Sequence, residues 1–380
     1  LLIQNCHCSQ NSSSDGGSSI MLESSILFKS GSAIKDCTFT DNYDLLRGTL
    51  AISLSSELEV SNCSFKNHKS VTSVVDVINT SSYSVLKLNS VQFFNNTSII
   101  FMLAVRGLTT LSTTTIESLT IDRCDTLIFT DFTVGKVTVK NSIFSNNIGN
   151  SQFYQSTIDM TDTKYLSNSS SNPAGAIDLY QNSILTCNRC TFDGNKATSG
   201  GAIRVDSKST IKVSNSTFIN NVVEDSGGAL YMINSKGGSF IENSSITKNT
   251  AGGTGFVFMI ESKLTLKNVF VSSNKSLTST SGIALQSSTI EIYNSTLTDH
   301  RAEFGVYLIL TAGSSGIISG TSITASSSSL GGTIGQIINS SLKFTSCLLE
   351  NLDCGSGPCL TTADSTVVID DVIGNNLVTQ

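Results

Sequence analysis

Residues 200–221 read GGAIRVDSKSTIKVSNSTFINN. Two glycines open this stretch, and short runs in which apolar and polar residues alternate follow them, separated by polar turns. The next glycine pair, Gly227 and Gly228, restarts the pattern as GGALYMINS. Short strands divided by turns and repeated along a chain predict a coil of stacked repeats rather than a globule.

The same unit recurs along the chain as a motif F-x-x-N, or as a variant with another apolar residue in the first place, which we call the anchor. Successive anchors from Phe39 to Ile373 lie 21 to 28 residues apart. Clear members start at Phe39, Phe93, Phe144, Phe192 and Phe218. The sequence therefore predicts an all-β fold, a right-handed parallel β-helix of about 14–15 coils of ~26 residues, with about three strands per coil.

The alternation assigns a face to each position of the repeat. Successive side chains of a strand point to opposite faces, so the anchor and the position two before it face inward, and the position three before it faces outward. Asn recurs three residues after the anchor. Because Asn tolerates a left-handed backbone and stacked Asn side chains can hydrogen-bond along a column, we expect a sharp turn and an Asn ladder there. The inward column is expected to hold Phe39, Phe65, Phe93, Phe144, Phe192 and Phe218.

The composition narrows the classes of function. The chain has 380 residues and a net charge of −6, without a basic run, which argues against a nucleic-acid partner. No apolar stretch approaches the ~20 residues of a membrane-spanning helix, so no span is expected in this segment. Since the chain starts at Leu1 and the repeat leaves no linker, we expect residues 1–380 to form a single β-helix domain, a mature or internal part of a longer secreted chain.

Three glycine-containing motifs carry a family resemblance. GGAI at residues 200–203, GGAL at 227–230 and AGAI at 174–177, together with the F-x-x-N members, resemble polymorphic membrane proteins. Those are bacterial surface proteins with a parallel β-helix passenger, and the wider pattern is similar to pectin-lyase-like β-helix repeats. The resemblance spans nearly all of the chain and implies the fold and a surface location, whereas it says little about activity.

The ten cysteines suggest disulfides. Cys37 and Cys63 each lie two residues before an anchor in consecutive repeats. Stacked coils would bring their Cα atoms to about 5 Å, which suits a disulfide. Cys6 occupies the same column, so the connectivity of Cys6, Cys8, Cys37 and Cys63 stays open.

Two further cysteine pairs are close in sequence. Cys354 and Cys359 bracket a turn and predict a local disulfide. Cys187 and Cys190 form a C-x-x-C pair that could be a redox motif or half of a zinc site. A strand context without a βαβ pattern favours a structural disulfide or two buried thiols.

Eleven N-x-S/T sequons occur in the chain. We expect glycans at the outward-facing Asn62, Asn215, Asn243 and Asn294, with Asn79 and Asn339 as further candidates. Sequons that fall in the Asn ladder are expected to be less occupied, namely Asn11, Asn96, Asn168 and Asn274. Cysteines, sequons and low charge together predict a secreted or cell-surface location.

Candidate catalytic groups are few. Asp370 and Asp371 are neighbours, so on a strand they would point to opposite faces and could not act on one substrate. His68 and His300 occupy Asn-ladder positions, which favours a turn role. His7 with the adjacent cysteines would make a poor zinc site. We therefore expect no enzymatic activity, no cofactor and no metal.

These observations predict a non-enzymatic extracellular structural glycoprotein. It would be a rod-like β-helix subunit of a surface coat or filament, carry covalent N-glycans, and associate with itself end to end. A surface adhesin or glycan-binding β-helix is the alternative. A polysaccharide lyase or hydrolase of the pectin-lyase-like type is the second alternative.

Overall fold

The computed structural model describes residues 1–13, 20–22, 32–44, 49–54, 57–79, 84–106, 111–302, 306–328 and 333–378. Within these ranges every regular element is a β-strand and none is a helix. The chain divides into two compact units. The N-terminal unit comprises Leu1–Asn172 and Ala176–Thr186, and the C-terminal unit comprises Pro173–Gly175 and Cys187–Gln380. The expectation of one domain over residues 1–380 stays a prediction.

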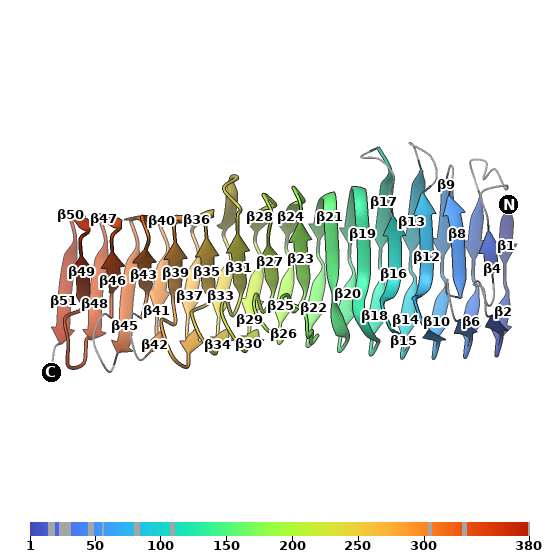
Figure 1. The fold of residues 1–380 in the computed structure, drawn as a ribbon, viewed down its shortest axis with the longest axis horizontal. Coiled ribbons are helices and arrows are strands. Elements are labelled where there is room, and N and C mark those ends of the chain that lie inside the picture. The colour runs from blue at the N-terminus through green and yellow to red at the C-terminus, as the bar shows by residue number, and fades with distance from the viewer. Residues whose placement is uncertain are drawn as a thin grey trace. The chain divides into compact units, whose positions relative to one another are not determined.

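One coil of the C-terminal unit shows how the repeat folds (Figure 1). On the first face lies β28 (Thr210–Ser214), and on the second lies β29 (Thr217–Ile219), which carries the anchor Phe218. After the short strand β30 (Val222–Val223) the chain crosses to the third face and forms β31 (Leu230–Ile233). Because each of these strands pairs in parallel with its equivalent in the next coil, the predicted parallel β-solenoid with three faces is confirmed.

The remaining strands of the C-terminal unit repeat this order. The anchor strands are β25 (Thr191–Asp193), β33 (Ser245–Thr247), β37 (Phe270–Ser272), β41 (Thr296–Thr298), β45 (Ser322–Ser328), β48 (Leu348–Asp353) and β51 (Ile373–Val378). First-face strands are β32 (Ser239–Glu242), β36 (Lys263–Lys267), β40 (Thr289–Tyr293), β44 (Ser315–Ser319), β47 (Ser341–Thr345) and β50 (Thr366–Asp370). Third-face strands are β27 (Ile203–Val205), β35 (Val257–Ile260), β39 (Ile283–Gln286), β43 (Leu308–Thr311), β46 (Gly335–Ile338) and β49 (Leu360–Ala363). Short strands are β26 (Lys196–Ala197), β34 (Thr250–Ala251), β38 (Lys275–Ser276) and β42 (Arg301–Ala302).

The N-terminal unit is built in the same way. Its anchor strands are β2 (His7–Ser9), β6 (Thr38–Thr40), β10 (Ser64–Lys66), β14 (Gln92–Phe94), β18 (Thr120–Asp122), β20 (Ile143–Ser145) and β22 (Lys164–Leu166). First-face strands are β1 (Leu2–Gln4), β5 (Ala33–Lys35), β9 (Glu57–Ser61), β13 (Val85–Asn89) and β17 (Thr113–Glu117). Third-face strands are β4 (Ile20–Leu22), β8 (Leu50–Leu54), β12 (Ser73–Asn79), β16 (Phe101–Arg106) and β23 (Ile177–Tyr180). Short strands are β3 (Ser12–Ser13), β7 (Tyr43–Asp44), β11 (Lys69–Ser70) and β15 (Thr97–Ser98). Two long strands run through the corner onto the next face, β19 (Asp125–Lys140) and β21 (Ile148–Thr161), and β24 (Ile184–Asn188) contains the boundary between the units.

The predicted inward column of aromatic anchors is confirmed. In the N-terminal unit Phe39, Phe65 and Phe93 are in register, with ring centroids 4.7 and 5.0 Å apart along the stack. In the C-terminal unit Phe192 and Phe218 stack at 4.9 Å. All five rings are at most 1% exposed. Because the register is fixed by buried side chains, a slip of one residue would turn these rings outward.

The predicted Asn ladder is present, but its backbone differs from the prediction. Asn221 Oδ1 accepts hydrogen bonds from Asn195 N and Nδ2, both at 3.0 Å, and its own Nδ2 donates to Phe192 O at 3.0 Å. The left-handed residue is Asn220, with φ of 57°, one position earlier. The expectation of a left-handed ladder Asn was therefore wrong, because the column selects Asn for its side-chain amide.

Two further columns of buried polar side chains follow the other corners. Before the anchor strands, Ser216 Oγ donates to Ser214 O at 2.7 Å and accepts from Cys190 N at 3.0 Å, while Ser216 N donates to Ser244 Oγ at 3.0 Å. Before the first face, backbone N–H groups donate to the serine hydroxyl of the next coil at 3.0–3.2 Å in the column Ser235, Ser262, Ser288, Ser314 and Ser340. These hydroxyl ladders satisfy corner N–H groups that regular strand pairing leaves over.

The two glycines of the repeat are required for different structural reasons. Gly200 has φ of +60°, a left-handed conformation that glycine adopts without a steric cost. Gly201 has no such φ, but a Cβ placed on it would lie 2.2 Å from Gly228 O of the next coil. The first glycine therefore makes the turn, and the second allows two coils to approach closely.

Candidate functional site

The structure places the two ladder histidines inside the solenoid. His68 replaces Asn in its column: Asn42 N donates to its Nδ1 at 3.2 Å, and its Nε2 lies 3.0 Å from Phe39 O. His300 is fully buried between the rings of Phe256 and Tyr307, and neither ring nitrogen has a hydrogen-bond partner among the described residues. Burial lowers the pKa of each imidazole to about 4. Both rings are therefore neutral near pH 7 and are closed off from any substrate.

The other candidate catalytic and metal-binding residues are not brought together either. Asp371 has φ of 52° and accepts a hydrogen bond from Ser346 Oγ at 2.9 Å, while Asp370 ends the neighbouring strand. His7 is exposed on β2. Among the described residues, no three His, Cys, Asp or Glu side chains are grouped closely enough to hold a metal ion.

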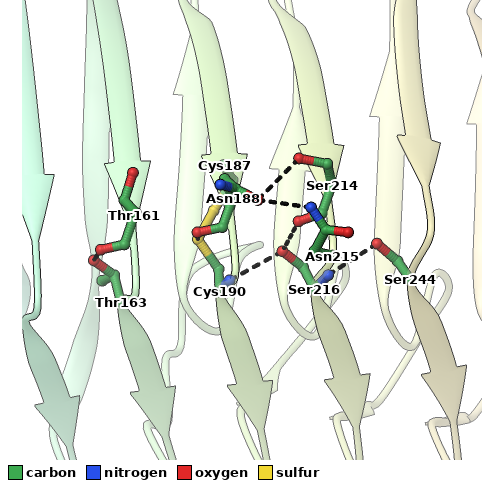
Figure 2. The surroundings of a disulfide bond; sticks show 9 residues. All are labelled: Thr161, Thr163, Cys187, Asn188, Cys190, Ser214, Asn215, Ser216 and Ser244. Atoms are coloured by element: carbon green, nitrogen blue, oxygen red, sulfur yellow. Dashed lines mark hydrogen bonds between the residues drawn. A yellow bond between two sulfur atoms is a disulfide. The ribbon is translucent and has the colours of Figure 1, made fainter.

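Two of the expected disulfides are formed. Cys187 is bonded to Cys190 (Figure 2), and Cys354 is bonded to Cys359. The first bond closes a corner of the C-terminal unit, where Cys190 occupies the position that Ser216 and Ser244 take in the following coils (Figure 2). Cys187, Cys190 and Cys354 are at most 2% exposed and Cys359 is half-buried, which suits a structural role.

The expected bond between Cys37 and Cys63 is not formed. Both are free, buried thiols. Cys37 Sγ donates to Lys35 O at 3.0 Å and Cys63 Sγ to Ser61 O at 3.2 Å, the same bond that serine makes in this column. Burial raises the pKa of Cys63 to about 11, so the thiol stays protonated and is a poor nucleophile. Cys6 and Cys8 are free as well.

The sequons separate by burial. Asn62, Asn215, Asn243 and Asn294 are exposed and have φ between 47° and 52°. Asn339 is exposed too, whereas the side chain of Asn79 lies outside the described residues. The ladder amides of Asn96, Asn168 and Asn274 are at most 1% exposed.

A polar cluster that sequence reasoning missed lies on the outer side of the third face in the N-terminal unit. Asp76 on β12 is in register with Ala104 on β16, which is in register with Asp131 on β19. Arg106 lies between the two carboxylates, with Nη1 3.7 Å from Asp76 Oδ1 and Nε 3.9 Å from Asp131 Oδ2. Its guanidinium also lies 5.2 Å from the centre of the Phe101 ring.

Both carboxylates of this cluster are largely shielded from solvent. Asp76 is only 8% exposed. Burial raises the pKa of Asp131, and the neighbouring Arg106 opposes that rise. The two acids lie two coils apart, roughly 10 Å at the strand spacing, which is near the upper end of the gap in inverting glycosidases. Alignment of the repeats would have found them, because residues 76, 104 and 131 occupy one position of the coil.

Comparison with known protein families agrees with this architecture. Residues 201–377 match the family described as right handed beta helix region. Residues 189–206 match the Chlamydia polymorphic membrane protein repeat. Together with the solenoid geometry, these matches show a right-handed parallel β-helix with polymorphic-membrane-protein-like repeats, as the sequence motifs predicted.

Two of the solved structures that match do so at low identity and low TM-score. The tailspike protein 3 of bacteriophage CBA120 is 12% identical, with 91% of this chain and 56% of that chain covered and a TM-score of 0.35. The chain thus spans little more than half of that tailspike. A PL6 family alginate lyase, AlyGC, is 9% identical over 99% of this chain and 97% of the lyase, with a TM-score of 0.20. No protein with a curated description matches at a significant level. Within the described residues, we find no helix with the length and apolar character needed to cross a membrane.

Proposed function

We propose that this protein is a non-enzymatic, extracellular structural glycoprotein, a surface-exposed solenoid that serves as the subunit of a coat or filament. The observation that carries the proposal is that its recurrent polar side chains are buried and hydrogen-bond neighbouring coils to one another. Asn221, His68 and Ser216 hold neighbouring coils together through buried hydrogen bonds instead of facing a cleft. The polymorphic membrane protein repeat at residues 189–206 supports a place at a surface.

The test of this role is a turnover assay on the purified protein. It is incubated with neutral and acidic polysaccharides, and the release of reducing ends and of unsaturated products is followed. We expect no release. A release that falls in both D76N and D131N would overturn the structural role in favour of the lyase or hydrolase alternative, because Arg106 contacts both carboxylates and their separation is close to the gap used by inverting glycosidases.

End-to-end association is the finer part of the proposal. In the last coil described, the inward side chain of Ile369 is 61% exposed, whereas Phe344, in register with it one coil earlier, is 1% exposed. Covering such a face with a second copy would remove apolar surface from water and pair the strand edges. We expect sedimentation to show concentration-dependent growth that is lost in I369K and kept in V222K, a matched change on the side of the coil. Monomers of wild-type protein at every concentration would contradict this part.

A surface adhesin is the second candidate. It is favoured by the outer cluster of Arg106, Asp76 and Asp131, which presents donors and acceptors on rigid strands. Binding of the purified protein to cells, weakened in R106A and unchanged in the exposed-site variant K212A, would support this role. Equal binding by both variants would contradict the use of this cluster.

A further inference from the structure

Two partly exposed aromatic rings of the N-terminal unit are covered by arginines of the same unit. The guanidinium of Arg106 lies over the Phe101 ring at 5.2 Å, and that of Arg123 lies over the Phe94 ring at 5.3 Å. Each arginine also lies near a carboxylate. Arg123 Nε is 3.5 Å from Asp122 Oδ2. A cation over an aromatic face gains from the quadrupole of the ring, and the carboxylate adds a second attraction.

The C-terminal unit contains the same kind of aromatic surface without such a cover. Tyr231 on β31 and Phe258 on β35 are in register, and their ring centroids lie 5.3 Å apart with planes at 37°. Both side chains are half-buried on the outer side of the third face, because their neighbours Met232 and Met259 are fully buried. Among the described residues, no arginine or lysine lies over either ring.

The nearest cation in register is already engaged. Arg204 on β27 is the strand neighbour of Tyr231. Its Nη2 donates to Asp206 Oδ2 at 2.6 Å, and the two side chains are only 15% and 16% exposed. A short, shielded ion pair of this kind fixes the guanidinium and leaves the aromatic pair open to another cation.

The charge around the aromatic pair is negative. Burial raises the pKa of Tyr231, Arg204 opposes the rise, and Asp225 and Asp206 add to it, which places two carboxylates and one guanidinium within electrostatic reach of the phenol. Asp206 is paired with Arg204, whereas Asp225 is exposed and, among the described residues, its carboxylate accepts a hydrogen bond from the Ser226 hydroxyl at 3.1 Å and has no cationic partner. Asp225 therefore leaves one uncompensated carboxylate within electrostatic reach of the Tyr231 phenol.

We propose that Tyr231, Phe258 and Asp225 form a binding site for the guanidinium of an arginine side chain presented by a partner protein. The partner's arginine would take the place over the rings that Arg106 and Arg123 take in the N-terminal unit. A carboxylate beside an aromatic face matches a guanidinium and repels an anionic ligand. This site goes beyond the structural role proposed above and does not depend on it.

The probe for this site is the blocked peptide acetyl-Gly-Arg-Gly-amide, titrated into the full chain and followed by calorimetry at low and high salt. We expect binding that weakens with salt, and no binding of acetyl-Gly-Glu-Gly-amide. Y231L and D225N should each weaken the arginine peptide by about tenfold. F94L is the matched control, because that outward ring already has its guanidinium, and it should bind like the wild type.

Two results would overturn the site. One is equal affinity in wild type, Y231L and D225N, which would place peptide binding elsewhere. The other is binding of a neutral maltooligosaccharide without binding of the arginine peptide, which would assign the rings to sugar stacking. Because Asp225 is exposed, D225N leaves the core unchanged and keeps the test valid even if Y231L folds poorly.

Discussion

Replacement of Asn221 by alanine tests the Asn ladder directly. The change removes an acceptor for Asn195 N and Nδ2 and a donor to Phe192 O and Asn249 Oδ1, four contacts of 2.9–3.0 Å. Asn195 and Asn249 are fully buried, so water cannot replace the lost partner. The buried Asn195 N–H loses its acceptor, which costs ~1–3 kcal/mol, and the loss of the three weaker amide contacts adds to this, so we expect a loss of about 3 kcal/mol in the free energy of unfolding.

His68 occupies the Asn-ladder position in its own coil, so replacement of Asn221 by histidine provides a graded comparison. Asn221→His can keep the two bonds to the backbone, as His68 does, and loses the two amide contacts, so we expect a loss of about 1–2 kcal/mol. Urea unfolding gives the overall loss, and hydrogen exchange of the Asn195 amide reports the local opening. Lys212→Ala, an exposed change on β28, is the control. A loss below about 1 kcal/mol in Asn221→Ala, or equal losses for histidine and alanine, would refute the ladder as a source of stability.

Three further predictions concern acid, the glycine pair and glycans. The pKa of His68 and of His300 is about 4 in the folded chain, below the usual 6.5, so the unfolded chain takes up protons first. Stability is therefore full above about pH 6.5 and falls between about 6.5 and 4, by on the order of 3 kcal/mol per histidine; thermal melts against pH should show this fall, reduced in H68N and in H300N. Gly201→Ala should cost several kcal/mol because its Cβ would lie 2.2 Å from a backbone oxygen, whereas Gly238→Ala, with nothing within 4 Å, should be close to neutral in the same melts. Glycopeptide mass spectrometry should find higher occupancy at the exposed sequons Asn62, Asn215, Asn243 and Asn294 than at the buried sequons Asn96, Asn168 and Asn274. The reverse order would contradict the assignment of the first set as outward.

The period of the sequence predicted the fold because buried anchors recur once per coil. Phe218 and its aromatic equivalents needed only strand alternation to be assigned inward, and the structure confirms them. The predicted anchor Ile373 was wrong by one residue, because Gly374 is in register with the buried Leu349. The hydroxyl ladder was harder to see, since Ser216, Cys63 and their equivalents differ in type but donate the same bond to the carbonyl two residues earlier. That equivalence also explains why a spacing suited to a Cys37–Cys63 bond was misleading: the thiols take the place of serine hydroxyls.

The candidate site could not be read from local sequence. Arg106 reaches Asp76 and Asp131 across coils, 30 and 25 residues away, and no short motif records such contacts. The same holds for Tyr231 and Phe258, which meet because β31 and β35 are in register. Only the position of each residue within the coil, compared between coils, brings these side chains together. Sequence reasoning followed the inward positions, where burial imposes a pattern, and missed the outward ones.

The amides of the Asn ladder also form a directed chain. From Asn195 through Asn221 and Asn249 to Asn274, each Nδ2 donates to the Oδ1 of the next coil at 2.9–3.0 Å. Their dipoles are thus aligned, whereas the backbone dipoles of strands largely cancel, and aligned hydrogen bonds polarise one another. The positive end of this chain points toward His300, the next residue of the column. A run of neutral side chains therefore opposes the protonation of a distant ring, so an interruption at Asn249 would be felt two coils away.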